Sequence, residues 1–163
     1  MRPIVSSMKA PTTGISKMLD QFIRPLFDEH VEQTTFIDGV QFIRRLELYV
    51  SLGLLKSTTH LCTSDVTDLY TMIPQEEAIA ILRRFLVHFG YNHVKGMTLD
   101  AIESLARIVL TENVFIYENK YYRQIKGGAM GSAFTLTLAN IFMWDWEQKI
   151  AENQRNSNEL YGR

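Results

Sequence analysis

Apolar residues recur every three or four positions along several stretches of the chain, which is the spacing of one face of an α-helix. The first stretch runs from Ile15 to about His30, and Pro25 inside it should kink or end that helix. The same spacing predicts further helices over residues 39–52, 75–88, 99–111 and 132 to about 154. The pattern thus predicts several helices of ordinary length.

Residues with capping chemistry mark several of these helix ends. Asp38 can accept a hydrogen bond from a free backbone amide at the start of the second helix, and Gly53 can end that helix. Pro74 suits the start of the third helix, because a first-turn amide has no partner to lose there, and Thr98 can cap the fourth. The second helix is expected to turn its apolar residues inward: Phe42, Ile43, Leu46, Tyr49 and Val50.

Shorter stretches are interpreted as β-strands, and the first of them contains a proline and branched residues. Residues 2–7 and 60–64 are two of them, and residues 113–117 and 120–125 are predicted to form a hairpin that turns at Glu118 and Asn119. The mixture predicts an α+β fold, with several helices packed on a small antiparallel sheet, in a single domain over residues 1–163.

Composition is typical of one compact intracellular domain. A chain of 163 residues with 46% hydrophobic content can bury a sizeable core. It contains no run of about 20 apolar residues, and no apolar signal-peptide core follows Met1, so we expect no membrane partner and a nuclear or cytoplasmic location. The single cysteine, Cys62, cannot form an intrachain disulfide or a cysteine-based zinc site, and its apolar surroundings predict a buried thiol.

The net charge of −1 counts against strong binding of nucleic acid, whose phosphates normally supply much of the affinity. Positive charge is nevertheless clustered locally. The clusters include Arg44-Arg45, Arg83-Arg84, and the group of Lys120, Arg123 and Lys126. Charge runs on helices are usually solvated faces, and a phosphate-binding role is the alternative.

The segment Asp-Val-Thr-Asp-Leu-Tyr, residues 65–70, directly follows the predicted strand at residues 60–64. An aspartate at the end of a buried strand is costly unless it gains a partner, and such an aspartate usually holds a divalent cation. Tyr70 lies close enough in sequence to form the floor of a neighbouring pocket. The alternative for Asp65 is a helix or turn cap, since Thr67 and Asp68 follow it.

A glycine-rich stretch, Lys-Gly-Gly-Ala-Met-Gly-Ser at residues 126–132, runs directly into the last predicted helix. Glycine lets the backbone approach a ligand closely and adopt a positive φ. The alternative is a simple strand-to-helix turn. Carboxylate, aromatic ring and glycine-rich turn together indicate nucleotide chemistry.

These stretches resemble the catalytic motifs of reverse transcriptases. The segment from Asp65 to Tyr70 is similar to the first catalytic motif, and residues 127–132 are similar to the later glycine motif. Residues 2–5, Arg-Pro-Ile-Val, resemble the fingers motif, and Leu-Ala-Asn-Ile-Phe-Met at residues 138–143 resembles the Penelope-like and telomerase-related branch. The resemblance covers nearly the whole chain and implies the fingers and part of the palm of a right-hand polymerase.

The resemblance assigns Asp65 to catalysis and metal binding. Its carboxylate would hold Mg²⁺, with Mn²⁺ as a substitute, and the backbone carbonyl of Val66 would be a further ligand. Five residues would bind the incoming nucleotide besides Val66: Arg2 and the backbone amide of Asp68 at the triphosphate, Tyr70 under the sugar, and Met130 and Gly131 at the templating base pair. A ring under the sugar would exclude a 2′-hydroxyl; an ordinary core tyrosine is the alternative.

The implied protein is an RNA-directed DNA polymerase of a retroelement, with an RNA template, a DNA primer and deoxynucleoside triphosphates as partners. Reverse transcriptases carry a later aromatic-x-Asp-Asp turn, and no Asp-Asp pair occurs in residues 1–163, so this fragment alone is expected to be inactive. A non-catalytic nucleic-acid-binding or assembly domain of the same fold is the alternative. Without the hairpin that carries this turn, the strand at residues 60–64 would keep an unpaired edge, so self-association is expected.

Overall fold

The computed structural model describes residues 10–163 of the chain. The strand predicted at residues 2–7 and the nucleotide-binding role predicted for Arg2 lie outside these residues. Six α-helices occur in the described part: α1 (Thr13–Val31), α2 (Gly39–Ser51), α3 (Leu69–Met72), α4 (Gln75–His88), α5 (Leu99–Thr111) and α6 (Ala133–Asn156). A short 3₁₀ turn, Glu32–Thr34, follows α1.

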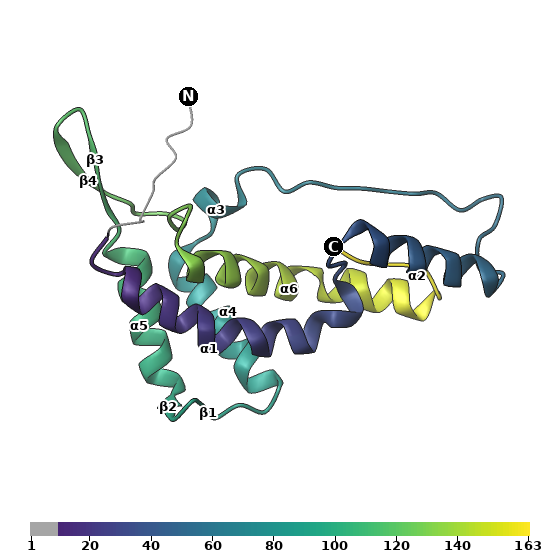
Figure 1. Cartoon of the computed structure of the whole chain (residues 1–163), viewed down its shortest axis with the longest axis horizontal. Helices are drawn as coiled ribbons and strands as arrows, with labels where there is room; N and C mark the ends of the chain where they lie inside the picture. The colour runs from purple at the N-terminus through teal and green to yellow at the C-terminus, as the bar shows by residue number, and fades with distance from the viewer. Residues whose placement is uncertain (1–9) are drawn as a thin grey trace.

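Four short strands make two separate antiparallel pairs in the same residues. They are β1 (His93–Val94) with β2 (Met97–Thr98), and β3 (Val114–Tyr117) with β4 (Lys120–Arg123). The combination confirms the α+β prediction in its general form. The predicted arrangement is wrong in one respect, because the main helices pack on one another and the strand pairs lie at the periphery (Figure 1).

The core lies between α1, α4, α5 and α6. Helix α6 contacts both α1 and α4, and α5 contacts the same two helices. All four helices contribute fully buried side chains: Leu19, Ile23, Leu82, Phe85, Ile102, Phe134, Leu138 and Ile141. Burial of each such side chain stabilises the fold by about 1.5–3 kcal/mol before the entropy cost of ordering is subtracted.

Helix α1 continues through Pro25, although the sequence predicted a kink or an end there. Pro25 removes one backbone hydrogen bond, the one that the carbonyl of Gln21 would accept. Both residues lie on the exposed face of α1, where that carbonyl can bind water. The opposite face carries the buried Ile23 and Phe27, so the packing of one face outweighs the loss on the other.

Helix α2 has the predicted start and end but not the predicted packing. The Asp38 side chain accepts a hydrogen bond from the Gln41 backbone amide at 2.7 Å, and Gly53 adopts a φ of +69° just after the helix. None of its residues is buried within the described part of the chain, and Ile43 and Val50 are about half exposed. The apolar spacing therefore identified the helix, while the predicted inward orientation holds only in part: Phe42, Leu46 and Tyr49 are half-buried, and Ile43 and Val50 are exposed.

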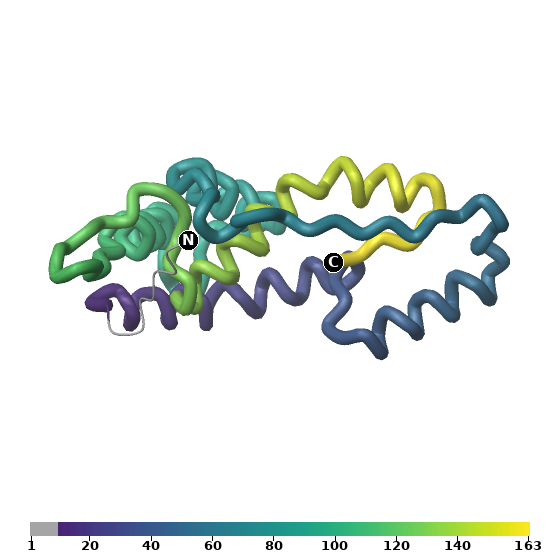
Figure 2. The backbone as a smooth tube through the Cα atoms, turned by 90° about the horizontal axis from the view of Figure 1, so that it is seen from above, coloured from purple at the N-terminus to yellow at the C-terminus, as the bar shows by residue number. Residues whose placement is uncertain are grey.

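The predicted strand at residues 60–64 is absent from the described structure. Residues 59–66 have no regular secondary structure, and they belong to the long connection between α2 and α3 that runs along the molecule (Figures 1 and 2). A strand needs a neighbour for its backbone hydrogen bonds, and the described residues supply none there. The strand edge that was expected to drive self-association is thus missing, and self-association itself stays a prediction.

Cys62 is exposed, so the prediction that its thiol is buried is wrong for this structure. We expect a thiol reagent such as a maleimide to label the native protein at about the rate of the denatured protein. Mass spectrometry after brief labelling measures this. Labelling that requires denaturant would contradict the exposed placement and restore the prediction of a core thiol.

Candidate functional site

The glycine-rich turn and the start of α6 form an open pocket together with Tyr70 of α3. The pocket has a volume of about 310 Å³. It is lined by Tyr70, Ala129, Met130, Gly131, Ser132, Ala133, Thr135 and Leu136. Most of these side chains are apolar, so the pocket offers a surface for a flat or apolar part of a ligand.

Backbone hydrogen bonds hold the two sides of this pocket together. The Gly128 amide donates to the Tyr70 carbonyl at 2.8 Å, and the Gly127 amide donates to the Ile73 carbonyl at 2.9 Å. The Gln75 side-chain amide also donates to the Gly127 carbonyl at 2.9 Å and to the Leu110 carbonyl at 3.1 Å. The turn is therefore fixed to α3, α4 and α5 at the same time.

Gly127 has to be glycine for two reasons. Its φ is +69°, a left-handed backbone conformation that costs free energy for any residue with a Cβ. A Cβ at this position would also lie 2.3 Å from the Tyr70 carbonyl oxygen and 2.6 Å from the Thr71 backbone. The sequence predicted that these glycines let the backbone approach a ligand closely. At Gly127 the close neighbour is the backbone of α3, and the approach to a ligand stays a prediction.

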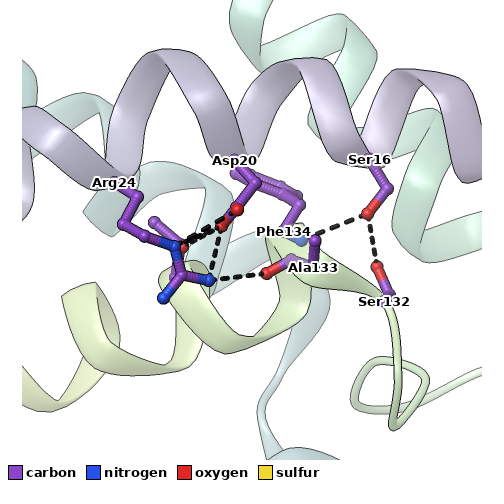
Figure 3. Close-up of polar contacts among 7 residues, drawn as sticks. Ser16, Asp20, Arg24, Ser132, Ala133 and Phe134 are labelled. Atoms are coloured by element: carbon purple, nitrogen blue, oxygen red, sulfur yellow. Dashed lines mark hydrogen bonds and ion pairs between the residues drawn. The ribbon is translucent and has the colours of Figure 1, made fainter.

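A polar contact between α1 and α6 fixes the start of α6, where Ser132 lines the pocket (Figure 3). The N-terminus of α6 receives no capping bond from its own Ser132; Ser16 of α1 supplies one, since its hydroxyl accepts from the Phe134 amide at 3.1 Å. The two serine hydroxyls are 2.8 Å apart, and both residues are buried. Ser16 thus satisfies an orphan amide of the helix that begins at the pocket.

Farther along the same two helices, Asp20 joins α1 to α6. Its carboxylate forms an ion pair with Arg24 at 2.7 Å and accepts a hydrogen bond from the Thr137 hydroxyl (Figure 3). Arg24 also reaches the Ala133 carbonyl at 3.5 Å. Neither Ser16 nor Asp20 was predicted as part of the site, because only the packing of α1 on α6 brings them to it.

Three of the residues predicted to bind a nucleotide meet in the pocket. Tyr70 is half-buried and packs against the core, Met130 is 37% exposed, and Gly131 has a φ of +91°. These residues come from stretches far apart in the sequence. Their predicted proximity is present in the structure, whereas their contact with a nucleotide stays a prediction.

The residues predicted to hold the metal do not line this pocket. Asp65 and Val66 are exposed in the irregular connection before α3. Asp68 precedes α3 with a φ of +60°, and its carbonyl accepts from the amides of Thr71 and Met72. An aspartate tolerates this left-handed conformation better than most residues.

A metal ion needs several oxygen ligands at once. Within residues 10–163, no group of three histidine, cysteine, aspartate or glutamate side chains is placed to hold one. Asp65 and the Val66 carbonyl thus do not fit a magnesium site without further ligands.

When the chain is compared with models of protein families, with curated proteins and with solved structures, none of them matches. Among residues 10–163 there is also no helix with the length and apolar character required to cross a bilayer.

Proposed function

We propose that the chain is the fingers-and-palm part of a reverse transcriptase, which copies an RNA template onto a DNA primer. One observation carries this proposal: Tyr70 and the turn with Met130 and Gly131 line a single pocket, although they are far apart in the sequence. The hydrogen bond from the Gly128 amide to the Tyr70 carbonyl fixes this proximity through the backbone. The resemblance to reverse transcriptases implies that an aromatic ring and a glycine turn together bind the incoming nucleotide.

In this proposal Tyr70 selects the sugar of the incoming nucleotide. Its backbone is held by the glycine turn, and its ring packs partly on the core, so the ring has little freedom to move aside. A rigid ring beneath the sugar leaves no room for a 2′-hydroxyl. Deoxynucleoside triphosphates are therefore the proposed substrates.

Asp65 is the proposed catalytic carboxylate. Two-metal phosphoryl transfer requires more than one carboxylate, and no group of ligands surrounds Asp65 among residues 10–163. The proposal therefore requires an aromatic-x-Asp-Asp turn outside residues 1–163 to complete a magnesium site.

Primer extension by a longer form of the protein that includes such a turn tests the proposal. With an RNA template, a DNA primer and magnesium, we expect Asp65→Ala to lower extension at least about a hundredfold, as loss of a group that stabilises transition-state charge does. We expect Tyr70→Ala to raise ribonucleotide incorporation relative to deoxynucleotides at least about tenfold, because the sugar pocket loses its steric block.

Two variants serve as controls. Tyr70→Phe keeps the ring and should keep the sugar selection. Asp38→Ala removes an exposed carboxylate that caps α2, and extension should stay near the wild-type rate. Undiminished extension by Asp65→Ala, or unchanged sugar selection by Tyr70→Ala, would contradict the proposed roles.

A non-catalytic nucleic-acid-binding or assembly domain is the second candidate. The observation that favours it is the position of Asp65 outside the residues that line the pocket. A longer form that binds primer and template but does not extend the primer would decide for this candidate.

A further inference from the structure

The β3–β4 hairpin projects from the helical body (Figure 1). Its strands contact mainly each other, and every residue of the hairpin is exposed except Phe115, which is half-buried. A two-stranded hairpin without a packing partner is only marginally stable in water. This one has its base anchored, since the Gln124 amide donates to the Asn113 carbonyl at 2.9 Å and the Asn113 side chain donates to Gln124 at 2.6 Å.

One face of the hairpin is aromatic. Phe115 pairs with Tyr122 across the strands and Tyr117 pairs with Lys120, so these four side chains share a face. The rings of Phe115 and Tyr122 are stacked with centroids 5.6 Å apart, and Tyr117 meets Tyr122 at 6.4 Å. Tyr117 is 59% exposed and Tyr122 is 42% exposed, so large ring surfaces face solvent.

Positive charge outweighs negative charge around this hairpin. Lys120 lies on the aromatic face, Arg123 lies on the opposite face, Lys126 follows β4, and Glu118 in the turn is the one acidic residue of this stretch. Among residues 10–163, no carboxylate forms an ion pair with Lys120, Arg123 or Lys126. Several arginines elsewhere are paired with carboxylates: Arg24, Arg83, Arg84, Arg107 and Arg163. Residues 113–126 thus carry three positive charges and one negative charge, on a chain whose net charge is −1, and Lys120 is the cation beside the rings.

We infer that the aromatic face of the β3–β4 hairpin binds single-stranded nucleic acid, with bases stacked on Tyr117 and Tyr122 and phosphates near Lys120. Exposed rings interleaved with cations are how proteins bind single strands without reading their sequence. An acidic protein surface would match the cations but would leave the rings without flat partners. Duplexes fit poorly, because their bases already stack on one another. This inference does not rest on the proposed polymerase activity.

The test is fluorescence anisotropy with the whole 163-residue chain and labelled 20-nucleotide oligo(dT), oligo(U) and a duplex of the same length. We expect both single strands to bind more tightly than the duplex at about 50 mM salt. Comparison of the Kd for oligo(dT) with the Kd for oligo(U) shows whether the hairpin prefers DNA or RNA. Tyr117→Leu/Tyr122→Leu keeps the apolar character but removes the stacking rings, so the Kd should rise at least about tenfold. Lys120→Gln should make the negative slope of log K against log salt shallower by about 0.7.

Matched variants distinguish base stacking on these two rings from nonspecific binding to any exposed aromatic residue. Tyr117→Phe/Tyr122→Phe keeps both rings and should bind like the wild type. Tyr121 is 78% exposed on the opposite face, so Tyr121→Leu should change the Kd by less than about twofold. The inference is wrong if the wild type fails to bind single strands, if the double leucine variant binds like wild type, or if Tyr121→Leu weakens binding equally.

Discussion

Replacing Gly127 by alanine is expected to lower the free energy of unfolding by about 2–5 kcal/mol. The left-handed conformation at this position costs about 1–2 kcal/mol for a residue with a Cβ, and overpacking against fixed neighbours costs about 1–3 kcal/mol more. The neighbours here are backbone atoms of Tyr70 and Thr71, which cannot rotate away as a side chain could. Urea denaturation followed by circular dichroism measures the loss.

Gly53 provides a matched control for the backbone term. It has the same φ of +69° as Gly127, but a Cβ there would meet no atom within 4 Å. Gly53→Ala should therefore cost only the conformational part, about 1–2 kcal/mol. Equal losses for the two variants would show that the contact between the turn and α3 is not tight, and the pocket geometry would have to be revised.

Local sequence patterns predicted the five long helices because the necessary signals lie within or directly beside each of them, whereas the one-turn helix α3 was not predicted. Thr98 caps α5 as expected, since its hydroxyl accepts from the Ala101 amide at 3.2 Å. The hairpin turn was also predictable, and Glu118 and Asn119 both adopt positive φ angles. In each case the residue that decides the structure is within four positions of the group it contacts.

Signals that depend on a distant partner were misread. The apolar run at residues 60–64 was interpreted as a strand, but no neighbouring strand exists for it among residues 10–163. The apolar spacing of α2 likewise gives a helix with an apolar side and does not say what covers that side. Composition describes what a segment can do, whereas burial depends on which other segment reaches it.

The residues of the candidate site also fall into those that the sequence indicated and those that it did not. The family resemblance assigned Tyr70 and the glycine turn to one nucleotide site, and they line one pocket, while their contact with a nucleotide stays a prediction. Ser16 could not be found, because a serine in the first turn of an apolar helix carries no local signal for the amide of Phe134 that it caps. Asp65 was placed at a strand end that does not form, so the cost of burial that suggested a metal does not apply in this structure.

A buried ionic cluster outside the pocket ties the last residues to α6 and α1. The Glu147 carboxylate is 2% exposed, lies 3.0 Å from the Arg163 guanidinium and accepts a hydrogen bond from the Tyr161 hydroxyl at 2.8 Å. The guanidinium also lies 5.2 Å from the centre of the Phe27 ring. Backbone bonds complete the attachment, since the Phe36 amide donates to the Arg163 carbonyl at 2.7 Å.

Removing the charge of Arg163 is also expected to lower the free energy of unfolding strongly, by about 3 kcal/mol near neutral pH. Arg163→Met keeps a long stem over Phe27 but leaves the Glu147 carboxylate buried without its cation, and breaking a buried pair in this way costs about 3–5 kcal/mol. Burial raises the pKa of Glu147, which limits the loss because the carboxyl can take up a proton. Urea denaturation at pH 7 measures the difference.

Arg84→Met is the matched control. Arg84 lies 3.4 Å from Asp145 on the same helix α6, but its side chain is 60% exposed. Exposed pairs of this kind contribute about 0–1 kcal/mol, so this variant should be nearly as stable as the wild type. A similar loss for both variants would mean that ion pairs of α6 matter in general and that the buried cluster has no special role.

The dependence on pH gives the sharpest check of this cluster. The folded state holds the Glu147 proton more tightly than the unfolded state does, mainly because burial raises the pKa of this carboxyl above its ordinary 4.5, against the lowering effects of Arg163 and Tyr161. Its contribution to stability is therefore fully present below about pH 4.5 and is lost as the pH rises through the folded pKa.

Glu147→Gln cannot titrate, so the stability of the wild type minus that of this variant should fall from pH 4 to pH 8. Other carboxylates cancel in this difference, including Glu76, whose pKa is lowered by its hydrogen bonds from Arg107. The cost of Arg163→Met should change in the opposite sense, because a protonated Glu147 needs no cation: it should be small at pH 4 and reach its full size near pH 7. A cost that is the same at both pH values would show that Arg163 acts through its packing on Phe27 rather than through its charge.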